Sequence, residues 1–327
     1  MRGFTNHYNH DGEYALIGRQ GALCGNVNYA VGKSYFTEHA VAVRANKTNQ
    51  TRFLYYLFST MNLGQYSGQS AQPGLAVGNL VELENVVPSK PEQEKIASFL
   101  SSLDHLITLH QRKYDKLQVL KKAMLEKMFP KNGSSVPEIR FKGFTDAWEQ
   151  RKLGKVVKEV TRNDPTSEAP IMMITANNGF IEQSERYAFD NAGESLKKYI
   201  LLQKGELAYN HGASKLRPFG SCFALTTAES ARIPFVYHCF SAENQNAEFL
   251  SIELNGSEVE SQLRKIVSSG ARMDGLLNIS FDEYSTVTVL LPDIKEQEHI
   301  ADFFRNLDHL ITLHQRKFYI YGMSNFI

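Results

Sequence analysis

The segment LDHLITLHQRK occurs twice in this chain of 327 residues, at Leu103–Lys113 and again at Leu307–Lys317. The match extends backwards without a gap, because PEQEKIASFLSS at 91–102 aligns with KEQEHIADFFRN at 295–306. An internal repeat of this kind indicates a duplicated structural unit. Whatever fold the chain adopts must therefore contain the same element twice.

Each copy of the repeat predicts a long amphipathic helix with heptad spacing. A single helix cannot bury such a seam, so each helix needs a partner, and the nearest one available is the other copy. His110 and His314 fall in the seam, where we expect packed or register-setting histidines and no metal site. The predicted coiled-coil seam consists of Ile96, Leu100, Leu103, Ile107, His110, Tyr114, Leu117, Ile300, Phe304, Leu307, Ile311, His314 and Phe318.

Capping signals place the ends of the two helices. Ser89 and Asp293 each stand three residues before a glutamate, which is the pattern of a capping box. The first helix is expected over residues 89–130, where Pro130 ends it, and the second over residues 292–321, because Gly322 is unfavourable for continuing a helix. A linker at 131–143 and a tail at 322–327 follow.

The segments outside the helices alternate in hydropathy and are broken by glycine-rich turns, which is typical of β-rich domains. They cover residues 1–88 and 144–291, and the order of their motifs is similar. Gly12 of the first then aligns with Gly205 of the second, so the first segment lacks the counterpart of about fifty N-terminal residues. The predicted fold class is α+β, with a partial first domain, a complete second domain and two long helices.

The overall composition excludes several classes of protein. A chain with 42% hydrophobic and 22% charged residues is typical of a globular protein, and without an N-terminal apolar segment a cytoplasmic location away from membranes is expected. The net charge of +1 indicates no polyanion-binding surface by bulk count. Three widely spaced cysteines argue against a disulfide framework or a four-ligand zinc site.

The order domain, helix, domain, helix, together with PEQEKIA, KEQEHIA and GFTDAWEQRKLG, resembles the specificity subunit of type I restriction-modification enzymes. The resemblance implies two target-recognition domains that each read half of a bipartite double-stranded DNA sequence. It implies that the helices pack antiparallel as a spacer and bind modification subunits, with a restriction subunit joining the assembled complex. S-adenosylmethionine, ATP and Mg would be used by those partners, and no cofactor by this chain.

The resemblance places base-reading side chains in the glycine-broken loops. Arginine and lysine suit guanine or phosphate, and asparagine or glutamine suits the adenine edge. HGASKLR at 211–217 is the strongest candidate because several donors fall in one short loop. The candidate DNA-binding residues are Arg19, Gln20, Asn26, Asn28, Lys33, Asn177, Asn178, His211, Ser214, Lys215, Arg217 and Arg272.

The sequence lacks the main catalytic motifs, which favours a non-catalytic chain. Gly32–Ser34 lacks the upstream glycine of a phosphate-binding loop, because the required position holds Val27. No Asn-Pro-Pro-aromatic tetrad of an adenine methyltransferase occurs. The chain is therefore expected to direct methylation and cleavage by its partners. The alternative is a truncated or silent cassette protein that only binds partner subunits through its coiled coil, or a pair of chains that each contribute a second domain.

Overall fold

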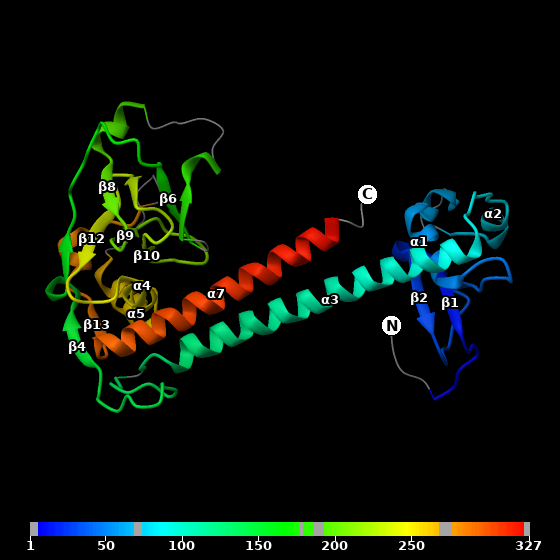
Figure 1. The fold of residues 1–327 in the computed structure, drawn as a ribbon, viewed down its shortest axis with the longest axis horizontal. Coiled ribbons are helices and arrows are strands. Elements are labelled where there is room, and N and C mark those ends of the chain that lie inside the picture. The colour runs from blue at the N-terminus through cyan, green and yellow to red at the C-terminus, as the bar shows by residue number, and fades with distance from the viewer. Residues whose placement is uncertain are drawn as a thin grey trace. The chain divides into compact units, whose positions relative to one another are not determined.

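The structure is a computed structural model, and it describes residues 6–68, 74–131, 133–176, 179–185, 193–267 and 276–323. The chain divides into two compact units, which are described separately. The first unit comprises Met1–Lys113 and His314–Ile327, and the second unit comprises Tyr114–Leu313. Figure 1 shows the fold and labels most of its helices and strands.

The first unit contains a three-stranded antiparallel sheet in the order β2-β1-β3. Helix α1 packs against β1 and β2, and the small core is built around Ile17, Leu63 and Leu75. The elements are β1 (Glu13–Gly18), β2 (Val27–Val31), β3 (Ala40–Val43), α1 (Thr51–Thr60), α2 (Val77–Val81) and the short 3-10 helices Gly21–Leu23 and Leu63–Tyr66.

The second unit contains a four-stranded antiparallel sheet in the order β10-β9-β12-β5, and three two-stranded pairs, β11-β8, β13-β4 and β6-β7. Helix α4 packs against β10 (Figure 1). The strands are β4 (Glu149–Lys152), β5 (Val157–Glu159), β6 (Met172–Thr175), β7 (Gly179–Glu182), β8 (Ile200–Gln203), β9 (Leu207–Asn210), β10 (Ser221–Ala224), β11 (Ser230–Ile233), β12 (His238–Ala242) and β13 (Thr288–Leu291). The helices are α4 (Ala247–Leu254), α5 (Ser257–Ile266), α6 (Phe281–Tyr284) and the 3-10 helices Leu153–Lys155, Gln183–Glu185 and Gly193–Lys198.

Two hydrophobic clusters form the core of the second unit. One joins the β9, β10 and β12 sheet to α4 and α5 and also takes in Ile300 and Phe304 from the last helix. The other lies among β6, β8 and β11 and includes Leu202 and Ile233. The mixture of helices and antiparallel strands confirms the predicted α+β class.

The two repeated segments form the long helices α3 (Lys90–Lys127) and α7 (Ile294–Met323). Within the second unit the rings of Phe129 and Phe304 are 6.2 Å apart, and Lys121, nearer the start of α3, pairs with Asp308, further along α7. Along α7 from Phe304 to Asp308, the partner residue moves backwards along the chain from Phe129 to Lys121. The paired segments therefore run antiparallel. The expected end of the second helix at residue 321 is wrong, because α7 continues through Gly322 to Met323, at a cost of about 1 kcal/mol.

One glutamine in each copy of the repeat fastens its helix to the neighbouring domain. In the first unit the Gln93 side chain accepts a hydrogen bond from the backbone of Gln50 (3.0 Å) and donates to Asn49 Oδ1 (3.1 Å) and to the carbonyl of Pro88 (2.9 Å). In the second unit Gln297 makes the corresponding three bonds, with Asn246 (3.0 Å), Gln245 (2.7 Å) and Pro292 (3.0 Å). Gln50 and Asn246 are the N-caps of α1 and α4. The duplication therefore extends from the helices into the domains.

The predicted capping box at the start of α7 is only half present. Asp293 caps the helix by accepting from the backbone N–H of Lys295 (2.8 Å). The side chain of Glu296, 0% exposed as a residue, instead accepts two hydrogen bonds from the Arg140 guanidinium, each 2.7 Å long. The linker at 131–143 is thus held to α7 by a buried ion pair, which local sequence spacing did not indicate.

Candidate nucleic-acid interface

The loop that follows β9 presents the strongest cluster of candidate contacts. Its centre is a tight turn, in which Ser214 N–H donates to the Arg217 carbonyl (3.0 Å) and Arg217 N–H donates to Ser214 Oγ (3.0 Å). The turn leaves Ser214, Lys215 and Leu216 exposed. Lys215 is therefore the cation of HGASKLR that is best placed to reach an external ligand.

Arg217 holds this loop to the end of α4. Its Nη1 donates to the carbonyl of Asn255 (2.9 Å), and the side chain is half-buried. Burial lowers the pKa of Arg217, although a guanidinium stays protonated at neutral pH. Arg217 therefore connects the 211–217 loop to the residue that follows α4.

His211 is not available as a base-reading residue in this structure, which corrects the expectation from the sequence. The side chain is buried, and its two ring nitrogens lie 2.7 Å from the carbonyl oxygens of Leu277 and Val236. The sequence places this histidine at the end of a strand and before a glycine, which predicts an exposed loop. In the structure the ring contacts Val236, before β12, and Leu277.

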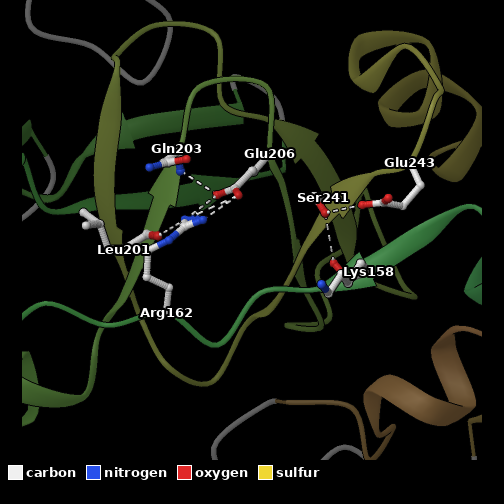
Figure 2. A network of polar contacts seen from close by, with 7 residues as sticks. All are labelled: Lys158, Arg162, Leu201, Gln203, Glu206, Ser241 and Glu243. Atoms are coloured by element: carbon white, nitrogen blue, oxygen red, sulfur yellow. Dashed lines mark hydrogen bonds and ion pairs between the residues drawn. The ribbon is translucent and has the colours of Figure 1, made fainter.

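The opposite end of β9 is also anchored by polar contacts. Glu206, directly before β9, accepts from Arg162 Nη2 (2.8 Å) and from the backbone N–H of Gln203 (2.7 Å), as Figure 2 shows. Arg162 Nη1 also donates to the carbonyl of Leu201 (3.0 Å). Nearby, Ser241 Oγ donates to Glu243 Oε1 (3.1 Å). The strand that carries the 211–217 loop is therefore held at both ends.

In the first unit Arg19 is used within the fold. Its Nε donates to the carbonyl of Leu75 and its Nη1 to the carbonyl of Glu38, each over 3.2 Å. This placement corrects the expectation that Arg19 is a free base reader. Gln20, Asn26, Asn28 and Lys33 are exposed, and the Lys33 ammonium lies 4.8 Å from the centre of the Tyr8 ring. Those four side chains remain open to a ligand.

Three candidates cannot be placed. Asn177, Asn178 and Arg272 lie outside the described residues. Among the candidates that are described, the only direct contacts between two of them join Ser214 to Arg217. The expected interface thus divides into a small cluster in the second unit and separate exposed side chains in the first.

The predicted seam residues of the two long helices are buried to different extents. Ile300, Phe304, Leu307 and Ile311 are buried, and so is His110. The remaining seam residues of the prediction are half-buried: Ile96, Leu100, Leu103, Ile107, Tyr114, Leu117, His314 and Phe318. Within the first unit the Nδ1 atoms of His110 and His314 are 2.8 Å apart, so one neutral ring donates to the other.

The facing histidines predict a pH-dependent stability. Burial lowers the pKa of both rings, and the nearby Lys113 and Lys317 lower them further. Because the unfolded chain holds these protons more tightly, the contribution to stability is complete above about pH 6.5 and is lost as the pH falls below it. We expect a lower melting temperature by circular dichroism at pH 5.5 than at pH 7.5.

Substitution of one ring separates this effect from general acid sensitivity. His110→Leu should make the melting temperature less dependent on pH over this range. The matched control is His105→Asn, since His105 is in the same repeated segment but is exposed. Equal pH dependence in His110→Leu and in the control would contradict the assignment.

None of the helices among the described residues has both the length and the apolar character needed to cross a membrane. In the described part of the chain, no three His, Cys, Asp or Glu side chains gather closely enough to hold a metal ion. Sequence reasoning missed Gln93, Gln297, Arg140 and Glu296 as positioning residues. Of these, Gln93, Gln297 and Glu296 carried a signal, because both copies of the repeat contain the triplet Glu-Gln-Glu, whereas Arg140 lies outside the repeat.

The chain is similar to known proteins over part of its length. Residues 2–119 match the model of the type I restriction modification DNA specificity domain. The chain is 49% identical over 106 residues to the type I restriction enzyme EcoprrI specificity subunit of Escherichia coli, which covers 32% of this chain and 26% of that protein. It is 33% identical over 129 residues to the MjaIX specificity subunit of Methanocaldococcus jannaschii, which covers 36% of this chain and 30% of that protein.

The fold has a relative among solved structures. The crystal structure of a type I restriction-modification system S subunit from M. genitalium superposes with a TM-score of 0.61 at 12% identity, covering 99% of this chain and 83% of that one. The matched sequence spans less than a third of the length of the two curated relatives. Residues 2–119 are therefore similar to the DNA specificity domain of type I restriction-modification systems, and the chain is similar over part of its length to specificity subunits of those systems.

Proposed function

We propose that this chain is the DNA sequence-recognition subunit of a type I restriction-modification system. The proposal rests on the matching hydrogen bonds of Gln93 and Gln297. These bonds join each long helix to a domain with exposed polar loops. In this proposal Lys215 and Ser214 of the second domain, and Gln20, Asn26, Asn28 and Lys33 of the first, face the DNA. The undescribed Asn177, Asn178 and Arg272 remain candidates.

The long helices set the distance between the two blocks of sequence that are read. A spacer of constant length makes a bipartite target with unread bases between its halves. This proposal keeps the domain bounds expected from the sequence for the first five segments, which are 1–88, 89–130, 131–143, 144–291 and 292–321. The last helix is extended to Met323, so the expected tail at 322–327 is shortened to 324–327.

Modification subunits are proposed to bind along the helices. Leu109 and Leu313 occupy the same position in the two copies of the repeat, and each is 36% exposed, away from the predicted seam. Exposed leucines at equivalent positions support docking of two similar partners. These partners would carry adenine methylation with S-adenosylmethionine, and a restriction subunit with ATP and Mg would add DNA cleavage, while this chain contributes no catalytic residue. A cytoplasmic location follows from this role.

One observation favours the alternative of a silent subunit. The β2-β1-β3 sheet of the first unit corresponds to β10-β9-β12, but β12 also pairs with β5 on its outer edge. Among the described residues of the first unit, no strand pairs with the outer edge of β3. If the first domain lacks that strand, it would fail to read DNA. The chain would then still bind its partner subunits.

The experiment that decides between them is a methylome. The chain is expressed with a modification subunit in a host that lacks adenine methylation, and modified adenines are mapped by long-read sequencing. A bipartite motif supports reading by both domains, and a palindromic one supports pairing of two second domains. Co-purification of the two proteins without methylation would support the silent subunit.

Lys215 provides a direct test of the interface. Removing one phosphate or base contact costs about 1–3 kcal/mol, so Lys215→Ala should weaken binding of the methylation motif roughly tenfold in fluorescence anisotropy. Lys204→Ala is the matched control, because Lys204 precedes the opposite end of β9 and pairs with Glu229 on the surface. Equal affinities of the two variants would remove the 211–217 loop from the interface.

A further inference from the structure

In the second unit, residues 139–159 cover three features of the domain and of the helix that follows it. Arg140 pairs with the buried Glu296, and the Phe141 ring lies 6.1 Å from the ring of Phe303 on α7. Next along the chain, β4 pairs with β13 (Figure 1), and β5 then pairs with the outer edge of β12. We call residues 139–159 the covering segment.

The first unit has the same three features, and among the described residues no segment covers them. Glu92 and Phe99 stand at the positions of Glu296 and Phe303 in the repeat, but Glu92 is exposed and Phe99 is 65% exposed. Residues 84–87 align with β13 when the repeat is extended backwards, yet they form no strand, and Val86 is fully exposed. The outer edge of β3 also pairs with no described strand.

The framework around these features is the same in both units. Gln93 donates to the Pro88 carbonyl and accepts from the N-cap of α1, as Gln297 does with Pro292 and the N-cap of α4. The glutamate and the phenylalanine are identical in the two copies. Their exposure therefore differs because the second unit has a covering segment. An open strand edge next to exposed apolar side chains is typical of an interaction surface.

We propose that the outer edge of β3, residues 84–87, Glu92 and Phe99 form a docking surface for an extended segment of a second protein. The segment has the chemistry of residues 139–159: an arginine for Glu92, an aromatic residue for Phe99, and short strands for residues 84–87 and β3. The proposal goes beyond the proposed function and does not rest on it, because docking of this segment requires no DNA.

The charges of the two surfaces are complementary. The covering segment contains six Lys or Arg residues and three Asp or Glu residues. Residues 82–92 of the first unit contain three glutamates and one lysine, all of them exposed. A second copy of this chain is a poorer source of the segment, because its own covering segment is held by the buried Arg140–Glu296 pair and by Trp148, which is 3% exposed.

A fluorescent synthetic peptide of residues 139–159 is the probe, titrated with the full chain in fluorescence anisotropy. We expect saturable binding that Phe99→Asp weakens by about tenfold or more. Val119→Asp is the matched control, because Val119 is also on α3 and is 70% exposed. Both substitutions are at exposed sites, so both variants should fold. Equal affinities of the two variants, or no binding to the native chain, would overturn the proposal.

An exchange of charges identifies the site within the chain. Glu92→Arg should weaken binding of the native peptide about tenfold, and a peptide with Arg140→Glu should restore binding to that variant while binding the native chain poorly. A peptide that displaced the covering segment from the second unit would contact Glu296 and would not respond to residue 92. Unchanged affinity in Glu92→Arg would therefore overturn the assignment of the surface.

Hydrogen exchange of the full chain, measured by mass spectrometry, locates the strands. The peptide should slow exchange of the backbone amides at residues 84–87 and in β3, with no change in β13. Absence of this protection would overturn the proposed pairing. If the chain alone formed dimers in light scattering and residues 84–87 were protected in them, the occupant would be a second copy, and the choice of a second protein would be wrong.

Discussion

Glu296→Ala is expected to destabilise the second unit by about 3–5 kcal/mol, because it leaves the Arg140 guanidinium without its partner. The side chains of Glu296 and Arg140 are 1% and 13% exposed, and they form two charge-assisted hydrogen bonds. These bonds raise the pKa of Arg140. Chemical denaturation of the full chain, followed by fluorescence of its one tryptophan, Trp148, reports on this unit.

A second Arg–Glu pair in the same unit provides the control. Arg305 makes two hydrogen bonds with Glu248, but the Arg305 side chain is 53% exposed, so Glu248→Ala should cost at most about 1 kcal/mol. The double variant Arg140→Leu with Glu296→Leu should recover most of the lost stability, since no charge is left buried. A loss for Glu296→Ala no larger than that for Glu248→Ala would show that water screens the Arg140 pair.

Gly25→Ala is expected to unfold the first unit. Gly25 has φ +81°, and an added Cβ would overlap the backbone of Gly64 in the adjacent 3-10 helix. The overlap involves backbone atoms, which no rotamer change relieves, and Leu63 next to it is one of the few core residues of this unit. A loss of more than about 4 kcal/mol follows. Hydrogen exchange measured by mass spectrometry should show rapid exchange in β1–β3 and slow exchange in β9–β12.

Gly21→Ala is the matched control. Gly21 also has a positive φ, +65°, but nothing lies within 4 Å of an added Cβ, so only the conformational cost of about 1–2 kcal/mol applies. In the methylome, Gly25→Ala should abolish one half of a bipartite motif if the first domain reads DNA. Protection of β1–β3 in Gly25→Ala equal to that in Gly21→Ala would contradict the predicted clash.

The long helices were predictable because their evidence is local and repeated. The seam from Ile300 to Ile311 follows heptad spacing, and the matching copies of Glu-Gln-Glu identified the first turns of both helices. Local evidence was weaker at the ends, where α7 continues through Gly322. A single glycine costs a helix only about 1 kcal/mol, so it does not by itself determine where the helix ends.

The candidate interface was predictable only in part, because residue type does not decide exposure. Lys215 and His211 stand four residues apart in one polar loop, yet Lys215 is exposed and His211 is 6% exposed. Burial of His211 depends on Leu277 and Val236, which are distant in sequence. Likewise Arg140 meets Glu296 across 156 positions of the chain.

The amino-acid sequence by itself determined the duplication, the two long helices and the α+β class, because repeats and hydrophobic periodicity are properties of neighbouring residues. The tertiary structure decided which polar residues brace the fold and which remain open to a ligand. That distinction depends on backbone carbonyls and ion-pair partners brought together from distant segments. Arg19 and His211 illustrate it, since two different side chains occupy the same two-carbonyl environment.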